Sequence, residues 1–287
     1  MISIDRTKNI GILFQPRSGS TVLQYYLSTV LNAINLDELF NFLIPNEKYV
    51  NRVVNLFAAH NLGSVPIEVV NSKHSDTNAQ TDPWARQLII NRITELSKIS
   101  VNKIYVNSYF KYAPTFSKDI HQNNIQFIDL TRADILYSII SNFVSKEVGQ
   151  FHSYSETSVL RIPEDKQFKF PINDFITILE TYIAQRIHVK EYFPDAPTLY
   201  YEQFQNSPAQ IRMLFSGIPK SIVSIPYNKF VGNHKNHIEN LKEIEDCYEQ
   251  FVNQYKEYFP QYFNDLPGIT IPSSQGKQPR NLSLNDN

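Results

Sequence analysis

The chain has 287 residues, 42% hydrophobic and 13% aromatic, which is enough apolar material for a sizeable buried core. Its formal net charge of −1 excludes the global basic field that draws many proteins to nucleic acid. The single cysteine, Cys247, excludes an intrachain disulfide framework and favours a reducing compartment.

The N-terminal stretch MISIDRTKNI lacks the apolar run of a signal peptide, and no segment approaches roughly 18 consecutive apolar residues. We therefore expect a cytoplasmic protein that neither spans nor binds a membrane. Residues 10–14, IGILF, are typical of a buried strand, and apolar residues at helical spacing run from Leu23 to Ile34. The turn PRSGST joins this strand to this helix.

Strand-like and helix-like segments alternate along the rest of the chain. Residues 35–45 are expected to form a loop or a short helix. Helices are predicted over 85–99, 134–147 and 172–193, and strands over 102–110, 125–130 and 197–202. This alternation favours an α/β fold with a mainly parallel central sheet.

We expect one domain over residues 1–271. Segments at about 43–100 and 149–172 would be insertions that form a lid or part of an acceptor site, since long loops often carry substrate contacts. Residues 272–287 are polar and aperiodic, which predicts a disordered tail.

The turn PRSGST has the residue types of an anion site. A strand–turn–helix unit presents unpaired helix amides and the positive end of the helix dipole. Gly19 allows a close backbone approach, Ser18, Ser20 and Thr21 add hydroxyls, and Arg17 adds a guanidinium. The alternative is that Ser18 or Ser20 only caps the helix while Arg17 is solvated. The standard phosphate-loop pattern GxxxxGK[ST] is absent.

PRSGST after an N-terminal strand resembles the 5′-phosphosulfate loop of sulfotransferases that use 3′-phosphoadenosine 5′-phosphosulfate (PAPS), especially bacterial and carbohydrate-acting members. The resemblance implies a three-layer α/β/α domain similar to the phosphate-loop kinases. It implies that the following residues hold the phosphosulfate: Arg17, Ser18, Gly19, Ser20 and Thr21. Many cytosolic relatives have an adenine-stacking Trp next, where this chain has Val22.

A second group of polar residues follows the strand predicted over 125–130. Arg132 lies at the junction with the next helix, and Asp134, Ser138, Ser141 and Ser145 share one helix face. An arginine with a serine two turns on can bind a phosphate, and the alternative is a solvated polar face.

This segment resembles the Arg-Asp-Pro motif of the same family, which binds the 3′-phosphate of PAPS together with a downstream serine. The resemblance implies this role for Arg132 and Ser141, with Ser138 as a substitute. The chain departs from the motif because Ala133 separates Arg132 from Asp134 and no proline follows.

Two landmarks lie toward the C-terminus, and with them the resemblance covers about residues 10–240. Residues 199–219 resemble a structural stretch of the family, in which Glu202 would be a buried bracing carboxylate. VGNHKN resembles the loop that closes over the nucleotide, although alone it would be read as a loop only. The resemblance implies nucleotide contacts for Gly232, Asn233 and Lys235.

Sulfuryl transfer to a hydroxyl needs a base near the acceptor and positive groups near the leaving phosphate. NLDELFNF resembles the segment of one branch that carries a glutamate base, which points to Glu38, and burial would have to raise its pKa. The alternative is a solvated carboxylate, and His60, His74 and His121 are poorer candidates. Arg17 and the loop amides would meet the leaving group, so no metal is expected.

The sequence thus predicts a PAPS-dependent sulfotransferase that acts on a hydroxyl of a carbohydrate or a small metabolite. Six aromatic residues either line the acceptor site or belong to the core: Phe40, Phe42, Tyr109, Phe110, Phe151 and Tyr154. One alternative is a phosphate-loop kinase of small molecules, with Asp129 holding magnesium. The other is a catalytically inactive binding protein of the same fold, consistent with Val22 and with the missing histidine base.

Overall fold

The computed structural model describes residues 1–37, 46–61, 63–65, 99–106, 124–149, 162–163, 165–204, 210–219 and 234–256. The chain divides into two compact units. Unit 1 contains Met1–Thr131 and Glu191–Ile225, and unit 2 contains Arg132–Lys190 and Pro226–Asn287. The tail 272–287 and most of the insertions expected at 43–100 and 149–172 lie outside the described residues, so these expectations and that of one domain over 1–271 stay predictions.

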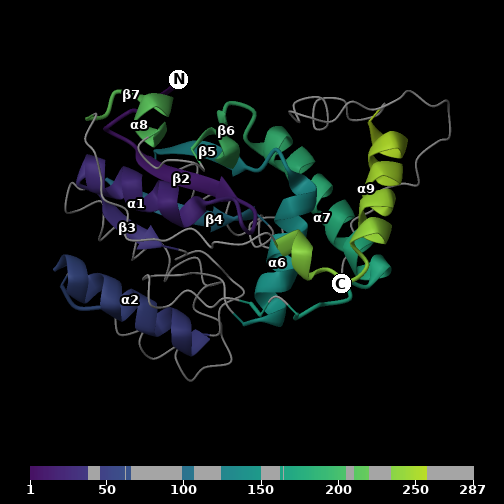
Figure 1. Cartoon of the computed structure of the whole chain (residues 1–287). Coiled ribbons are helices and arrows are strands. Elements are labelled where there is room, and N and C mark those ends of the chain that lie inside the picture. The colour runs from purple at the N-terminus through teal and green to yellow at the C-terminus, as the bar shows by residue number, and fades with distance from the viewer. Residues whose placement is uncertain are drawn as a thin grey trace. The chain divides into compact units, whose positions relative to one another are not determined.

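Unit 1 contains a five-stranded sheet in the order β3-β4-β2-β5-β6 (Figure 1). Its strands are β2 (Asn9–Phe14), β3 (Ile34–Asp37), β4 (Ser100–Tyr105), β5 (Ile125–Thr131) and β6 (Thr198–Tyr200). Every pairing in this sheet is parallel. The predicted α/β class with a mainly parallel sheet is therefore confirmed. Two short strands, β1 (Ile2–Ser3) and β7 (Phe215–Ser216), pair in a separate parallel sheet.

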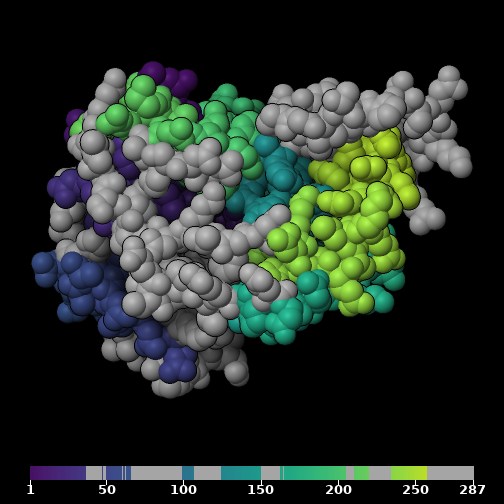
Figure 2. Space-filling view, viewed as in Figure 1, coloured from purple at the N-terminus to yellow at the C-terminus, as the bar shows by residue number. Residues whose placement is uncertain are grey.

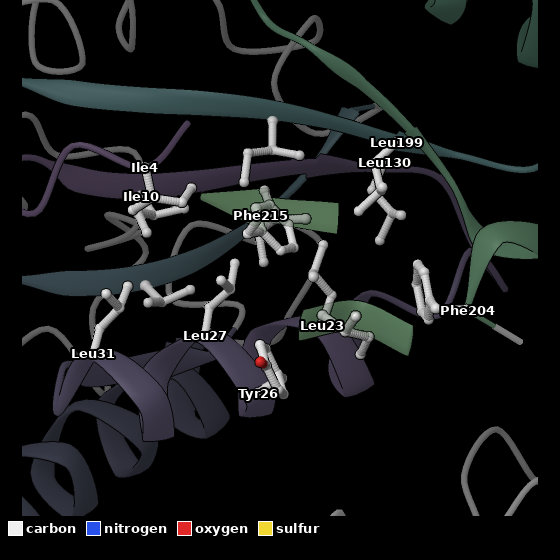
Figure 3. Packing of buried hydrophobic residues seen from close by; sticks show 14 of the residues in the cluster. Ile4, Ile10, Leu23, Tyr26, Leu27, Leu31, Leu130, Leu199, Phe204 and Phe215 are labelled. Atoms are coloured by element: carbon white, nitrogen blue, oxygen red, sulfur yellow. The ribbon is translucent and has the colours of Figure 1, made fainter. Parts of the chain in front are cut away.

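Helix α1 (Ser20–Leu31) covers one face of this sheet, and Figure 3 shows its leucines directed at the strands. Leu23, Leu27 and Leu31 pack in one buried cluster with residues of β2, β4 and β5. Each leucine that is fully removed from water contributes about 1.5–3 kcal/mol, so this face holds α1 on β2 and fixes the turn between them.

The end of α1 corrects one prediction. Asn32 adopts the left-handed conformation, with φ 50°, and its N–H bonds to carbonyls of the last turn. The helix therefore stops there, and Ile34 belongs to strand β3 instead of continuing the helical face. The start of the segment 35–45, expected to be a loop or short helix, is likewise extended as far as Asp37.

Two further α-helices, α2 and α8, lie in the described part of unit 1. Helix α2 (Asn46–His60), which no pattern predicted, buries Val50, Val53 and Phe57, and its outer side forms part of the surface in Figure 2. Helix α8 (Ile211–Leu214) is short and leads directly into β7. The predicted helix over 85–99 lies outside the described residues.

Unit 2 is mainly helical. Its elements are α6 (Ile135–Glu147), α7 (Ile172–Tyr192, whose last two residues fall in unit 1), the 3-10 helix η5 (His234–His237) and α9 (Leu241–Tyr255). Phe170 stacks on Phe143 of α6 at 3.9 Å between ring centroids and meets the ring of Phe175 of α7 edge-on. The bounds of α6 and α7 confirm the helices predicted over 134–147 and 172–193. Within the described ranges, no helix is both long and apolar enough to cross a membrane.

The predicted strands are confirmed with shifted ends. β5 matches the strand predicted over 125–130, whereas β4 begins before residue 102 and ends at Tyr105, so Val106 is not part of the strand as predicted. Residues 107–110 of that predicted strand lie outside the described ranges. β6 is shorter than predicted because the chain turns at Tyr201 into the 3-10 helix η3 (Tyr201–Gln203).

Candidate anion-binding site

The turn between β2 and α1 holds two residues in left-handed backbone conformations. Arg17 has φ 66° and Gly19 has φ 78°. The conformation is natural for glycine but costs an arginine roughly 1 kcal/mol or more, because its Cβ crowds the carbonyl. A non-glycine residue kept in such a conformation is a frequent feature of functional sites.

Gly19 is fixed by packing as well as by its backbone. A Cβ atom on this residue would lie 2.4 Å from Cδ2 of Tyr201. Tyr201 begins η3 and packs edge-on against the buried ring of Phe204, with 5.4 Å between centroids. The turn therefore lies directly against η3, and only glycine fits at this position.

Ser18 is fully buried, and its Oγ atom has no hydrogen-bond partner among the described residues. A buried hydroxyl without a partner costs about 1–3 kcal/mol, so a ligand that bonds to it would remove a real penalty. The N-cap of α1 is Gly19, and no side chain caps the helix. Neither Ser18 nor Ser20 is thus the simple helix cap of the alternative reading, and the amide of Val22 in the first turn donates to the carbonyl of Gly19 at 3.1 Å.

The structure adds a cation that the sequence reasoning missed. Lys103 lies in β4 opposite Ile12 of β2, and the residue is only 2% exposed. Its Nζ lies 3.1 Å from Oγ1 of Thr21, in the first turn of α1, and 5.8 Å from the ring centroid of Phe14. The sequence held one signal for this residue: a lysine within the strand-like stretch NKIYV. Lysine is rarely buried unless it has a partner.

Two positive features therefore meet at the start of α1: the helix dipole and the Lys103 ammonium. A cation near a helix N-terminus is electrostatically unfavourable by itself. The arrangement becomes favourable when an anion lies between the positive groups. Chemically, the turn is suited to binding a phosphate or sulfate group.

Asp129, the magnesium ligand of the kinase alternative, lies on the other side of the sheet. Its neighbours Ile128 and Leu130 both belong to the cluster beneath α1, so the alternation of a strand directs Asp129 away from α1. Its Oδ2 accepts a hydrogen bond from Oγ1 of Thr198 at 3.2 Å. In the part of the chain that the structure describes, no three His, Cys, Asp or Glu residues gather as a metal site.

In unit 2, Arg132 follows the last residue of β5, and its guanidinium lies over the ring of Tyr137, 5.1 Å from the centroid. The Tyr137 hydroxyl lies 3.3 Å from Nδ1 of His234 in η5. Asp134 is the N-cap of α6, and its Oδ1 accepts from the Tyr137 N–H at 2.8 Å. Because Ala133 separates Arg132 from Asp134, the aspartate lies at the N-cap position of α6.

The serines of α6 are not solvated. Ser138 and Ser141 are 1% and 2% exposed, which contradicts the reading of this face as a solvated polar surface. Both form interactions within the structure. They lie on the same helix as Tyr137, one and four residues after it, and Arg132 lies three residues before the first residue of this helix.

The remaining predicted site residues have mixed outcomes. Lys235 forms an ion pair with Glu245 of α9, at 3.2 Å and partly exposed. His237 Nδ1 lies 3.0 Å from the carbonyl of Lys166, so η5 is tied to the segment before α7. The predicted base and nucleotide-loop residues, Glu38, Gly232 and Asn233, lie outside the described residues. So do His74, His121 and the six aromatic residues proposed for an acceptor site.

Comparisons of the chain with protein-family models, with curated proteins and with solved structures find no match. What the site does is therefore inferred from its own residues. The strongest of these are a strained turn, a buried serine hydroxyl and a buried lysine at one helix N-terminus.

Proposed function

We propose that the chain is a PAPS-dependent sulfotransferase that binds the 5′-phosphosulfate group at the turn between β2 and α1. The observation that supports this most is the buried, unpartnered Oγ of Ser18 beside an uncapped helix N-terminus. The proposal includes a three-layer α/β/α arrangement similar to the phosphate-loop kinases, and a cytoplasmic location.

The residues of the turn fit the chemistry of a phosphosulfate. The group carries negative charge on both its phosphate and its sulfate oxygens, and each oxygen needs a donor or a cation. Ser18, Ser20 and Thr21 supply hydroxyls, Gly19 lets the backbone amides approach, and Arg17 supplies a planar pair of donors. Oxyanions at helix N-termini are held by this combination of amides and dipole.

The reaction would be an in-line transfer. The acceptor hydroxyl oxygen forms a new S–O bond while the bond from sulfur to the bridging phosphate oxygen breaks. The electron pair of that bond stays with 3′-phosphoadenosine 5′-phosphate, whose growing charge Arg17 and the amides stabilise. The hydroxyl proton passes to a general base, and we assign this role to Glu38. The acceptor is a carbohydrate or a small metabolite.

We assign the 3′-phosphate to the second group of residues. Arg132 provides the guanidinium, and Ser141 or Ser138 provides the hydroxyl. Gly232, Asn233 and Lys235 would contact the 3′-phosphate or the adenosine. Support for this half is weaker, because Asp134 and Lys235 already have structural roles in unit 2.

Two observations favour sulfuryl transfer over a kinase. In phosphate-loop kinases the hydroxyl after the loop lysine holds magnesium. Here the residue at that place, Thr21, lies at hydrogen-bond distance from the Lys103 ammonium. The only magnesium ligand suggested by the sequence, Asp129, lies on the opposite face of the sheet from α1.

The test is calorimetric binding of 3′-phosphoadenosine 5′-phosphate and of ADP without magnesium. We expect tight binding of the first, weak binding of ADP, and a loss of about 10- to 100-fold for both Arg17→Ala and Arg132→Ala, since each removes a charge-assisted contact. Lys8→Ala, which removes a partly exposed lysine of unit 1 that pairs with Asp5, is the control. Equal or tighter ADP binding would refute the nucleotide assignment and favour the kinase.

Transfer itself needs a second measurement. With PAPS as donor and a panel of hydroxyl acceptors, we expect sulfation that Glu38→Gln abolishes while nucleotide binding stays intact. Binding without turnover on any acceptor class would instead support the inactive binding protein.

A further inference from the structure

Two buried hydroxyl groups at the same edge of the five-stranded sheet have no hydrogen-bond partner among the described residues. One is Oγ of Ser18 in the turn after β2, and the other is Oγ1 of Thr131, the last residue of β5. Ser18 is 0% exposed and Thr131 is 1% exposed, and both residues belong to unit 1. Burying a hydroxyl without a bond costs free energy, so each of the two groups needs an explanation.

The strand register brings Thr131 close to the turn that contains Ser18. β2 and β5 are parallel neighbours, and their pairing runs to the last residue of β2 and the last but one of β5. Thr131 is therefore level with the first residue after β2, and on its other side it lies opposite Tyr200 of β6. The next residue, Tyr201, is the one that lies against Gly19 of the turn. The turn, the end of β5 and the start of η3 are thus neighbours at one edge of the sheet.

The position between β2 and β5 is also the switch point of the sheet, where the connections change direction. From β2 the chain passes through α1 to β3 on one side, and from β5 it leads to β6 on the other. Helix α1 covers the face that holds Ile128 and Leu130, as Figure 3 shows for Leu130. On the opposite face, the ring of Phe127 lies 4.5 Å from that of Phe193 between centroids. Sheets of this kind bind ligands outside the carboxyl ends of the strands at the switch point.

We propose that Thr131 is a ligand-binding residue of this site, and that its hydroxyl and the Ser18 hydroxyl together hold one tetrahedral oxyanion at the turn between β2 and α1. Each hydroxyl donates its proton to an oxygen of that group. The inference rests on the part of the proposed function that places an oxyanion at this turn, and it adds a contact from a second strand. It does not depend on which nucleotide carries the oxyanion.

Another threonine of the sheet shows how a structural hydroxyl is bonded. Thr198 of β6 donates its hydroxyl proton to Oδ2 of Asp129 at 3.2 Å. Thr131 lies two residues after Asp129 on the same strand and is more deeply buried than Thr198, yet its hydroxyl has no such bond. Valine has the same shape as threonine and is equally favourable in a strand. A threonine at this position is therefore better explained by a ligand that accepts its hydrogen bond than by the stability of the fold.

The experiment compares wild type with Ser18→Ala, Thr131→Val, the double variant and Thr131→Ser. Thr198→Val is the matched control, because it also removes a threonine hydroxyl from the sheet. Calorimetry measures binding of 3′-phosphoadenosine 5′-phosphate, of ADP and of inorganic pyrophosphate. Thermal melting records the stability of each unliganded variant.

We expect Thr131→Val to melt no lower than wild type and to bind pyrophosphate and 3′-phosphoadenosine 5′-phosphate about 10-fold more weakly, as for loss of a hydrogen bond to a charged group. Thr131→Ser keeps the hydroxyl and should retain most of the affinity. Thr198→Val should show the reverse, a lower melting temperature with wild-type affinity. Because both hydroxyls hold one group, the double variant should lose less affinity than the product of the two single losses.

Three results would overturn the inference. The first is wild-type affinity for both probes in Thr131→Val, and a lower melting temperature in that variant would show that a structural partner such as a buried water satisfies the hydroxyl. The second is a double variant whose loss equals the product of the single losses, because the hydroxyls would then act at separate places. The third is a wild type that binds none of the probes. If Thr131→Val does not fold, Thr131→Ala carries the same comparison.

The outcomes also separate this inference from the proposed function. Pyrophosphate binding that depends on both hydroxyls, with no preference for 3′-phosphoadenosine 5′-phosphate over ADP, upholds the role of Thr131 and refutes the sulfotransferase. A clear preference for 3′-phosphoadenosine 5′-phosphate that Thr131→Val leaves unchanged in strength supports the proposed function and overturns the role of Thr131.

Discussion

Two regions contain the residues that we propose to bind the nucleotide, and they differ in whether those residues also stabilise the fold. In the turn between β2 and α1, the fold accepts unfavourable features: Arg17 in a left-handed conformation, a buried Ser18 hydroxyl and a buried lysine at a helix N-terminus. Around Arg132 in unit 2, the Nε atom of the buried arginine also lacks a hydrogen-bond partner among the described residues, but two of its predicted neighbours have favourable structural partners. Asp134 caps α6, and Lys235 pairs with Glu245.

This difference between the two regions shows which residues are evidence for a bound ligand and which are explained by the stability of the fold. A residue that stabilises its surroundings would be retained without any ligand, so its presence says little about function. A residue that costs stability needs another reason to be there, and ligand binding is the most common one. The turn is thus the stronger part of the site, and the following experiments test that distinction.

The largest expected effect is that of Gly19→Ala. The new Cβ would lie 2.4 Å from the Tyr201 ring, at a φ of 78°. The strained backbone and the overlap together should lower the free energy of unfolding by about 2–4 kcal/mol, as measured by urea denaturation. Gly149→Ala is the matched control, because Gly149 has φ 68° but no atom within 4 Å of the added Cβ. Equal losses in the two variants would show that Tyr201 does not confine the turn.

Arg17→Gly should have opposite effects on stability and on binding. Glycine adopts a φ of 66° without strain, so the unliganded protein should gain up to about 1 kcal/mol. Binding of 3′-phosphoadenosine 5′-phosphate should weaken by about 1.5–3 kcal/mol because the charged donor is lost. Asn32→Gly, at another left-handed position of α1, controls for the backbone effect. If Arg17→Gly lowers stability and leaves binding unchanged, Arg17 has a structural role and does not bind the ligand.

The sequence predicted the elements whose local pattern agrees with their packing. IGILF is a continuous apolar run, the helices over 134–147 and 172–193 have apolar residues at helical spacing, and all three elements are found. Helix α2 was missed because its buried residues, among them Val50, Val53 and Phe57, lie within a polar segment. The end of α1 was predicted too far along the chain. Its last residue is followed by Asn32 in a left-handed conformation, and an asparagine predicts that conformation less strongly than a glycine does.

The candidate site divides in the same way. Arg17 to Thr21 were predicted because their chemistry is local to one turn. Lys103 could not be assigned from pattern alone, because its role depends on β4 lying beside β2, a non-local pairing. The sequence analysis placed Asp134 at the start of a helix but did not predict its role as the cap, and the ion pair of Lys235 depends on α9, which the sequence analysis did not predict.

A pH-dependent effect is expected in unit 2, at Tyr248 of α9. Burial, followed by the negative charge of Asp134 and by Tyr182, raises the pKa of Tyr248 in the folded state, and Arg186 opposes the shift. The unfolded chain therefore releases this proton first, near pH 10. The stabilisation is complete below that pH and is lost as the pH rises, by up to about 1.4 kcal/mol per pH unit.

Tyr248→Phe should remove this alkaline loss and leave stability near pH 7 almost unchanged, as denaturation at pH 8 and pH 11 would show. Tyr192→Phe, at a residue that is 54% exposed, is the control and should keep the wild-type pH dependence. The same flattening in both variants would mean that general repulsion between charges, and not the buried phenol, sets the alkaline limit.

The smallest effect is expected at the cap of α6, and it is the one most able to overturn the contrast between the two regions. Asp134→Ala removes the oxygen that accepts from the Tyr137 N–H and should lower the free energy of unfolding by about 1 kcal/mol. Asp134→Asn keeps that acceptor and should change stability by a few tenths of a kcal/mol only. If Asp134 is a cap and nothing more, both variants bind 3′-phosphoadenosine 5′-phosphate as wild type does. If the asparagine variant folds normally and loses affinity, the charge of Asp134 acts on the ligand or on Arg132. The second region would then be a binding site in its own right, because a cap retained for stability has no need of a charge.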